Sequence, residues 1–376
     1  MQTTNIKATL KLVEVLHDVE DPRQQGKVKH SLVNILFISI CAVFNSADTW
    51  EDIHMYAEYR RKWLSTYIDM SKGIPSSDTF RRVFGLIDPS QISELTHTII
   101  SKFFTKENQH ICLDGKTMRG NKSKEKGIRP VQIVSAWSET FGLCLGEVSV
   151  DKKSNEITAI PVLLDMLDIK GCTISMDAMG TQKDVVEKIV DKKAHYVLAL
   201  KGNQGKFFES VKTYMHEHGE KPKNLICDYF DESHGRCVRR RYFAIDIPED
   251  INKINEFKNL KTIIATENIS TRSSDSPVTS EWRYFITDHS KDYAKLANYV
   301  RGHWGVENKL HWHLDVHLGD DKDKKLDRNG TENISRIKRF LLNLVRKNDT
   351  TSKKSVRSKL KRMLWDEEYF LKILST

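Results

Sequence analysis

One late segment carries polar side chains of the kinds that bind metals and move protons. His303, Glu307, His311 and Asp315 recur at intervals of four residues within the stretch RGHWGVENKLHWHLDV. In a helix, this spacing places all four on one drifting face. The face could bind zinc through the histidines and the glutamate, supply one catalytic acid, or be a solvated polar surface. The zinc interpretation comes second because the helical HExxH signature, in which two histidines four residues apart accompany a glutamate base, is absent.

Two aspartates at the ends of strand-like segments indicate acid chemistry. Asp114 follows the apolar residues of HICLDG, and Asp177 follows those of CTISMDA. A single aspartate in such a place is more often a turn former or a helix cap. If the two strands are parallel neighbours, however, both carboxylates emerge at one sheet edge and repel each other unless cations lie between them. Such oxygen-rich sites suit Mg²⁺ or Mn²⁺, and two ions about 4 Å apart can activate a phosphodiester. A third acid is then expected from a late helix.

The elements that must position these acids alternate between strand and helix patterns. Apolar runs at 110–115, 130–138 and 142–151 predict three consecutive strands, and strand patterns at 172–178 and 195–202 each follow an amphipathic helix. Three strands with short connections form an antiparallel meander, whereas the later strands arrive through helical crossovers, so the sheet should be mixed. We therefore predict an α/β fold built on a ribonuclease-H-like mixed sheet with flanking helices.

The remaining patterns divide the chain into five predicted regions. Helical spacing of apolar residues dominates the N-terminal part, strand-like pieces replace the regular alternation after residue 218, and Lys and Arg are frequent near the end. We predict a helical N-terminal domain at 1–105, the first part of the core at 106–218, a β-rich insertion at 219–290, core helices carrying the third acid at 291–347, and a basic C-terminal tail at 348–376.

Positive charge is concentrated late in the chain. The 376 residues have a net charge of +9, yet the segment 324–362 alone holds fourteen Lys and Arg against three acids. Such a segment could follow a phosphate backbone or form a solvated helical face. The longest apolar run, at 32–44, is too short to cross a bilayer, and no secretion signal is recognisable. We therefore expect a cytoplasmic protein with no membrane partner.

Four motif blocks together resemble those of the H-repeat-associated transposases, which are insertion-sequence DDE transposases with a ribonuclease-H-like catalytic core. The blocks are LDGKTMRG at 113–120, SMDAMGTQ at 175–182, HYVLALKGNQ at 195–204 and RGHWGVENKLHWHLDV at 301–316. The earlier segment DPRQQGKVKHSLVNILFISICAVF resembles the helical domain that precedes the core in this group. The likeness extends from about Asp21 to Arg346.

The resemblance implies that Asp114, Asp177 and Glu307 form a DDE triad that holds two divalent ions, Mg²⁺ or Mn²⁺. The long separation of Asp177 from Glu307 suits members that place a β-rich insert before the last acid. In related transposases a Tyr, an Arg and a Lys accompany this glutamate, whereas Val, His and Leu occupy those positions here. The implied activity is metal-dependent phosphodiester hydrolysis at transposon ends, followed by attack of the freed 3′ hydroxyl on target DNA.

Basic and polar side chains near these blocks and in the insertion predict contacts with DNA phosphates. The candidates are Lys116, Arg119, Lys201, Asn203, Gln204, Arg236, Arg239, Arg240, Arg241, Arg301, His303, Lys309 and His311. Trp282 could stack on a base. The expected partners are terminal inverted repeats and target DNA, bound by a homodimer or larger assembly at the bacterial nucleoid. The alternative function is that of a catalytically inactive or domesticated DNA-binding protein, and surface ion pairs are the alternative role of the basic residues.

Overall fold

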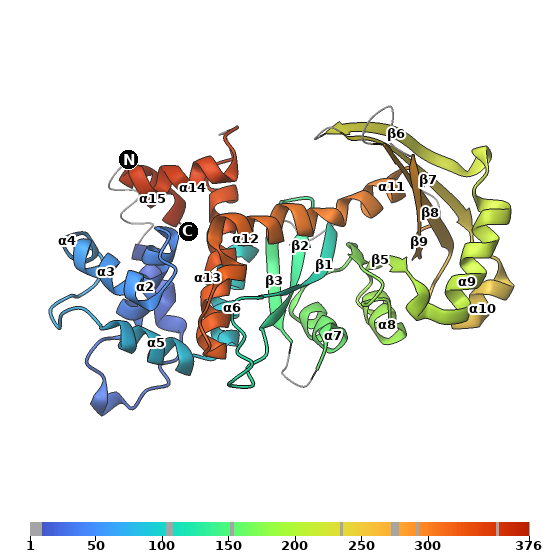
Figure 1. Ribbon diagram of the computed structural model, residues 1–376. Helices are drawn as coiled ribbons and strands as arrows, with labels where there is room; N and C mark the ends of the chain where they lie inside the picture. Colours follow the sequence, from blue (N-terminus) through green and yellow to red (C-terminus); the bar gives the residue numbers. More distant parts are fainter. Residues whose placement is uncertain are drawn as a thin grey trace.

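A nine-stranded sheet contains both the strands of the predicted core and those of the predicted insertion. The computed structural model describes residues 10–102, 108–150, 154–233, 236–271, 278–290, 293–350 and 353–375. The strand order is β3-β2-β1-β4-β5-β9-β8-β7-β6 (Figure 1). The strands are β1 (His110–Thr117), β2 (Gln132–Ser138), β3 (Leu143–Ser149), β4 (Thr173–Met176), β5 (His195–Leu200), β6 (Leu225–Ser233), β7 (Arg236–Asp246), β8 (Thr262–Thr271) and β9 (Thr279–Thr287).

The first five strands have the predicted ribonuclease-H-like arrangement. Strand β2 is antiparallel to both β1 and β3, so the three form a meander. Strand β1 pairs in parallel with β4, and β4 pairs in parallel with β5. Because parallel strands need crossover connections, helices α7 (Glu156–Met166) and α8 (Lys183–Asp191) link β3 to β4 and β4 to β5. The prediction of a mixed α/β sheet of this type is confirmed.

The strands of the insertion extend the core sheet instead of forming a second one. Strand β9 runs antiparallel to β5, and β8, β7 and β6 follow as an antiparallel series. Helices α9 (Gly205–Tyr214) and α10 (Glu249–Asn255) lie beside this extension at one end of the molecule (Figure 1). The pairing of β5 with β9 is therefore the seam that joins the two halves of the sheet.

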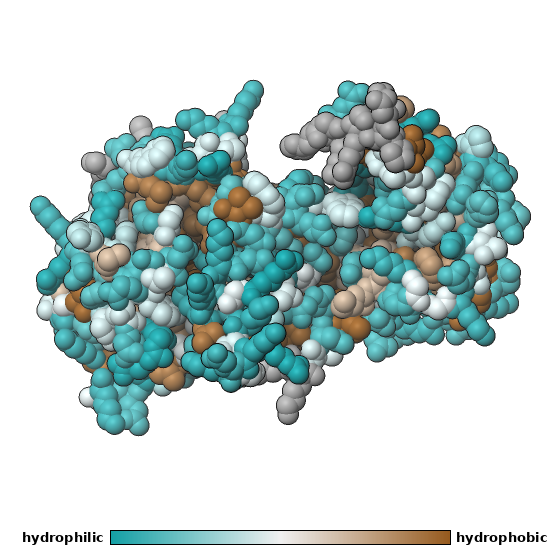
Figure 2. Space-filling view, in the orientation of Figure 1, coloured by the Kyte–Doolittle hydropathy of each residue, from teal (hydrophilic) through white to brown (hydrophobic). Residues whose placement is uncertain are grey.

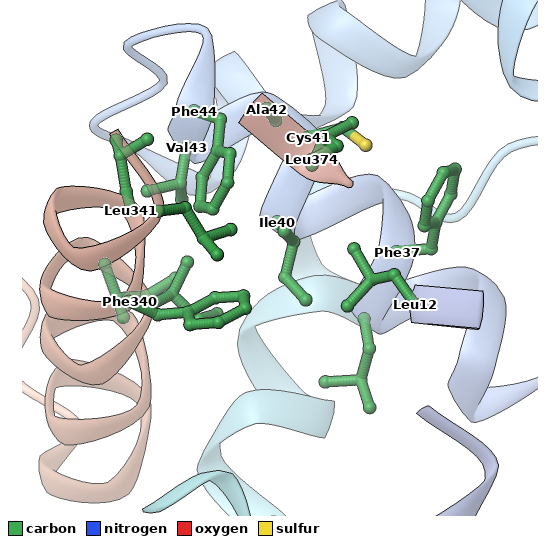
Figure 3. Close-up of a cluster of buried hydrophobic side chains, with 14 of the residues drawn as sticks. Leu12, Phe37, Ile40, Cys41, Ala42, Val43, Phe44, Phe340, Leu341 and Leu374 are labelled. Atoms are coloured by element: carbon green, nitrogen blue, oxygen red, sulfur yellow. The ribbon is translucent and has the colours of Figure 1, made fainter. Parts of the chain in front are cut away.

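The other end of the molecule is a layer of helices with a shared apolar core. These are α2 (Leu32–Phe44), α3 (Trp50–Tyr59), α4 (Arg61–Leu64), α5 (Ser77–Leu86), α6 (Pro89–Ser101), α14 (Val356–Trp365) and α15 (Glu367–Leu374). Phe37 and Ile40 of α2 lie in one cluster with Phe340 and with Leu374 of α15 (Figure 3). The segment predicted as a basic tail thus contains two helices, and α15 contributes buried side chains to the core of the N-terminal helices.

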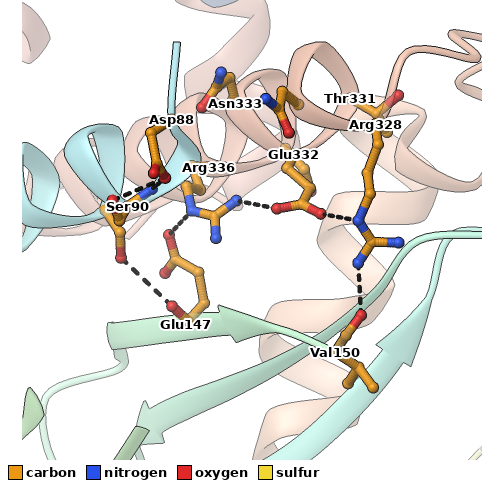
Figure 4. A network of polar contacts seen from close by, with 12 residues as sticks. Asp88, Ser90, Glu147, Val150, Arg328, Thr331, Glu332, Asn333 and Arg336 are labelled. Carbon is orange, nitrogen blue, oxygen red and sulfur yellow. Dashed lines mark hydrogen bonds and ion pairs between the residues drawn. The ribbon is translucent and has the colours of Figure 1, made fainter. Parts of the chain in front are cut away.

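Helix α13 (Arg328–Lys347) lies between the helical layer and the sheet, and it packs against α2, α5, α6 and β3. Its basic residues Arg336 and Arg339 are buried. Arg336 Nη1 lies 3.4 Å from Glu332 Oε2, and Arg336 Nε lies 3.8 Å from Glu147 Oε1 of β3 (Figure 4). Neither predicted role of segment 324–362 describes this helix, because buried charges need partners within the protein.

Three consecutive helical segments cross the sheet on the face opposite α7 and α8. They are α11 (Tyr293–Gly302), the π-helical turn η6 (Val306–His311) and α12 (Trp312–Leu318), which run from the β-rich end towards α13 (Figure 1). The space-filling view shows a largely hydrophilic face that is hollowed between the two ends of the molecule (Figure 2). Of the helices that the structure describes, none is both long enough and apolar enough to span a membrane.

Candidate active site

Two of the predicted acids lie side by side at one edge of the sheet. Leu113 of β1 pairs with Met176 of β4, the last pair of this parallel ladder; Asp114 is the next residue of β1, which continues to Thr117, and Asp177 directly follows β4. The backbone N–H groups two and three residues after Asp177 donate to its Oδ1 at 3.0 and 3.2 Å. The turn after β4 therefore fixes the orientation of this carboxylate.

The third acid comes from the helical segments that cross the sheet. Val306, Leu310 and Leu314 are buried in the core that these segments share with the helical layer. This apolar stripe holds η6 against β1 and leaves Glu307 at an exposed position facing the strand ends. The helical register of one short segment thus decides where the third carboxylate lies.

One cavity of about 480 Å³ is lined by all three acids. Lys201, which follows β5, and His303, four residues before Glu307, line the same cavity. Aromatic side chains also contribute to its wall, including Trp282 of β9 and Trp304. The structure therefore brings together six residues that the sequence predicts for the site, from positions 114 to 307 of the chain: Asp114, Asp177, Lys201, Trp282, His303 and Glu307.

The electrostatics of the cavity favour a cation. Partial burial raises the pKa of Glu307, and the nearby negative charge of Asp114 raises it further, while His311 and Arg283 oppose the shift. His311 Nδ1 lies 3.4 Å from Asp114 Oδ2. A set of carboxylates that share one cavity is the donor set of a hard divalent ion such as Mg²⁺ or Mn²⁺. The residues present therefore fit the ions that the sequence predicts.

A fourth carboxylate, which the sequence analysis did not include, lies close to this edge. Asn155 caps α7, so Glu156 occupies the first helical position. The Glu156 carboxyl group lies directly over Gly115, where an added Cβ would come within 2.1 Å of its Oε1. Burial raises the pKa of Glu156, and Asp114 contributes to the shift. The signal in the sequence was an acid in the first turn of the helix that follows the third strand.

Arg283 is a second residue that the sequence analysis missed. It lines the cavity from β9, and its guanidinium group lies 4.8 Å from the centre of the Trp304 ring. The strand pattern of β9 is visible in the sequence, but its pairing with β5 is not. Arg283 could therefore not be assigned to the site before the order of the strands in the sheet was known.

His303 belongs to a buried chain of polar groups. Its Nδ1 lies 3.0 Å from Ser175 Oγ, and the same hydroxyl lies 2.8 Å from His110 Nε2. Burial lowers the pKa of His303, against the opposing charges of Asp114 and Asp177. These polar contacts fix the plane of the His303 ring at the cavity wall.

Lys116 does not lie where a DNA phosphate could reach it. The side chain is buried, and its Nζ lies 2.5 Å from Asp315 Oδ1 and 2.9 Å from Asp321 Oδ1. The prediction of a phosphate contact at Lys116 is wrong because its ammonium group is enclosed by two carboxylates. Arg119, by contrast, has a side chain that is 81% exposed.

Two predicted phosphate ligands, Asn203 and Gln204, also support the turn that carries Asp177. Asn203 Nδ2 donates to the carbonyl of Ala178 at 2.8 Å, and Gln204 Nε2 donates to the carbonyl of Thr181 at 2.7 Å. The block after β5 therefore clamps the loop after β4. One amide N–H of each side chain is used in these bonds, and DNA contact by Asn203 and Gln204 stays a prediction.

The other predicted DNA contacts lie on the surface or at its edge, mostly in ion pairs. Arg239 binds Asp228 through two hydrogen bonds of 2.7 and 3.0 Å, and Arg240 Nη1 lies 2.8 Å from Asp231 Oδ2. The pairs Arg241 with Glu267, Arg301 with Asp231 and Lys309 with Glu139 complete the set. The side chain of Arg236 lies outside the described part of the structure. DNA contact by these residues stays a prediction.

The zinc interpretation of the helix face does not fit the geometry. Among the residues that the structure describes, one group of three has its ligand atoms within 4.8 Å of one another, and it does not include His303, Glu307 or His311. The three acids of the cavity do not form such a group either, and the ligands of two separate ions need not all lie within that distance of one another. Asp320, whose role the sequence left open, is buried and accepts a hydrogen bond from Ser335.

Comparisons with known proteins agree along most of the chain. Residues 105–344 match the family model described as Transposase DDE domain, and residues 13–99 match the model described as DDE_Tnp_1-associated. The putative transposase YncI of Escherichia coli O157:H7 is 38% identical over 353 residues, which cover 91% of this chain and 88% of that protein. The H repeat-associated putative transposase YhhI of Escherichia coli K12 is 35% identical over 370 residues, with coverage of 97% and 98%. A solved structure of the piggyBac transposase synaptic complex with hairpin DNA matches 98% of this chain and 81% of that one, with a TM-score of 0.45 and 11% identity.

Proposed function

The chain belongs to the family of transposases with a DDE domain, and we propose that it cleaves DNA at the ends of an insertion sequence and joins those ends to target DNA. One observation carries the proposal: Asp114 from within β1, Asp177 directly after β4 and Glu307 of η6 line one cavity. Nothing in the packing of the core requires three carboxylates there. Bound cations would relieve their mutual repulsion.

We assign Asp114, Asp177 and Glu307 as the ligands of two divalent cations, Mg²⁺ or Mn²⁺. When bound, these ions would stabilise the negative charge that develops on the phosphate oxygens during cleavage and transfer. Asp177 is already oriented by two backbone N–H groups, so the cost of ordering it on metal binding is small. His311, which approaches Asp114, restrains the second carboxylate.

The remaining side chains of the cavity suit a DNA strand. Lys201 and Arg283 would bind the phosphates on either side of the scissile bond, because both cations line the cavity. Trp282 and Trp304 would stack on unpaired bases of the cleaved strand. Joining requires that two ends be held together, so we propose that at least two copies act on the DNA, in the bacterial cytoplasm at the nucleoid.

The test is cleavage of a DNA that carries the repeats flanking the gene. We expect nicking at the repeat ends that depends on Mg²⁺ or Mn²⁺, and transfer of the 3′ end to a second DNA. The single variants Asp114→Asn, Asp177→Asn and Glu307→Gln should each lower the cleavage rate by at least about 10³-fold, since each removes a metal ligand. Gel-shift affinity for the same DNA without metal should be retained.

Asp184→Asn is the matched control, because Asp184 is an exposed acid in the first turn of α8. This variant should cleave at the wild-type rate. Cleavage that survives in all three site variants would disprove the triad. Specific binding of the repeats by wild-type protein without cleavage under any divalent ion would instead indicate a DNA-binding protein that has lost catalysis.

A further inference from the structure

A second cluster of ligand-type side chains lies at the opposite edge of the parallel strands. His195 begins β5, and Asp288 and His289 directly follow β9. One ligand atom from each of the three residues lies within 4.8 Å of the other two. His195 Nδ1 is 2.8 Å from Asp288 Oδ2, and the two imidazole centroids are 4.5 Å apart. Since β5 spans six residues, this cluster is about 17 Å from the cavity that contains Asp114.

The surrounding structure holds each of these side chains in place. The Tyr196 N–H donates to Asp288 Oδ1 at 3.0 Å, which leaves Oδ2 directed at His195. The His289 ring stacks on Tyr299 of α11 with centroids 5.4 Å apart, and its Nε2 lies 3.1 Å from Thr173 Oγ1. Outer partners of this kind orient the ligands of metal sites and fix the imidazole rings.

Burial and exposure also suit an ion that enters from solvent. Asp288 is 6% exposed, so its charge is largely removed from water, whereas the His195 side chain is 47% exposed. A buried carboxylate gains from a directly bound cation. The exposed imidazole leaves a path for the ion and a position for a water molecule.

We propose that His195, Asp288 and His289 form a binding site for one divalent transition-metal ion, with Zn²⁺ as the preferred occupant. Two imidazole nitrogens and one carboxylate oxygen are typical zinc ligands, and a water molecule would complete the tetrahedron. Mg²⁺ and Ca²⁺ are disfavoured because they select oxygen ligands. Ligand atoms at zinc bond lengths of about 2.0–2.1 Å lie roughly 3.3 Å apart. Side-chain rotations would therefore have to widen the 2.8 Å separation of His195 Nδ1 from Asp288 Oδ2 slightly and bring the His289 ligand atom, now within 4.8 Å, to the same spacing.

The position of the site indicates a structural role. His195 belongs to β5, while Asp288 and His289 follow β9, so the ion would bridge the seam that joins the two halves of the sheet. Tyr299, which packs on His289, lies in the helix that leads to Glu307. Zinc binding would therefore tighten the seam without taking part in the chemistry at the carboxylates. This site does not depend on the proposed transposase activity.

The experiment is zinc titration of the full-length protein by calorimetry, in saturating Mg²⁺ so that the carboxylate cavity is occupied. We expect one equivalent of Zn²⁺ per chain and a thermal midpoint that rises with zinc concentration. Co²⁺ in place of Zn²⁺ should give visible absorption bands of tetrahedral nitrogen and oxygen coordination. The variants His195→Ala and His289→Ala should each weaken zinc binding by roughly 100-fold, and Asp288→Asn should weaken it with the side-chain volume preserved.

His216→Ala is the matched control, since His216 is an exposed histidine that pairs with a single carboxylate, Glu220. This variant should bind zinc as the wild type does. Failure to bind Zn²⁺ at micromolar concentration would overturn the proposal, as would full binding in His195→Ala and His289→Ala. Zinc binding that is lost in His311→Ala but kept in His195→Ala would place the ion on the helix face near Glu307 instead.

Discussion

Replacing Lys116 with methionine should destabilise the protein while leaving its affinity for DNA largely unchanged. Methionine keeps most of the apolar stem but removes the ammonium group that lies between Asp315 and Asp321. The two carboxylates then lose their shared counterion. Breaking a fully buried ion pair in this way costs about 3–5 kcal/mol.

The expected magnitude is smaller than that limit because water reaches the carboxylates. The side chains of Asp315 and Asp321 are 32% and 26% exposed, so solvent recovers part of the lost interaction. Asp321 also keeps its hydrogen bond from the Arg119 N–H at 3.3 Å. We therefore expect Lys116→Met to lower the free energy of unfolding by about 2–3 kcal/mol.

The assay is equilibrium unfolding in urea, with the midpoint compared at constant slope. Lys116→Arg keeps the charge and should lose less than half as much stability. In a double-mutant cycle, Asp321→Asn should cost less in the Lys116→Met background than in wild type, with a coupling of about 1–2 kcal/mol. A stability loss under about 0.5 kcal/mol with no coupling, together with a DNA-binding salt slope reduced by about one, would refute the reasoning and restore Lys116 as a phosphate contact.

Three other predictions concern pH, backbone packing and the loop after β4. Burial lowers the pKa of His110 to about 3. Below pH 6.5 the unfolded chain therefore takes up a proton that the folded ring excludes, and the free energy of unfolding decreases as the pH is lowered. His110 should account for about 2 kcal/mol of the stability lost between pH 7 and pH 5. Urea unfolding midpoints at the two pH values measure this loss, and His110→Gln should lack the His110 contribution. Gly120→Ala should cost about 2–4 kcal/mol by the same assay, because the new Cβ would lie 2.6 Å from backbone carbonyl oxygens of the loop 321–323; a loss within 0.5 kcal/mol would contradict this packing. Asn203→Ala should slow metal-dependent cleavage by about 10-fold, since it frees the turn that carries Asp177, while gel-shift affinity stays at the wild-type value; weaker binding with an unchanged cleavage rate would indicate a phosphate ligand instead.

Local patterns were sufficient to predict the first five strands and the two aspartates beside them. The apolar runs that end at Asp114 and Asp177 identify strands, and the order of strands and helices limits the arrangements that connect them. Their parallel pairing, which the sequence could only suppose, is confirmed. That Glu307 reaches the same cavity follows from a helical stripe of three apolar residues.

The partners of charged residues could not be predicted, because they depend on contacts across long stretches of chain. Lys116 and Asp321 are 205 residues apart in sequence, and no local pattern links them. The excess of Lys and Arg in residues 324–362 is real, yet a count of charges does not tell whether Arg339 is solvated or, as the structure shows, buried. Asn203 presents the same difficulty, since an amide beside a motif could bind a phosphate or a neighbouring loop.

The late position of α13 in the sequence determines how long α2 waits for its packing partner during synthesis. Helix α2 ends at Phe44, but its partner α13 begins only at Arg328, on the order of 280 residues later. At about 5–20 residues per second, the ribosome would need roughly 15–60 s to supply that partner. Until then the apolar face of α2 that later meets Phe340 has no cover from α13. A nascent chain of this length is therefore expected to bind holding chaperones, and the yield of folded protein should depend on their supply and on translation speed.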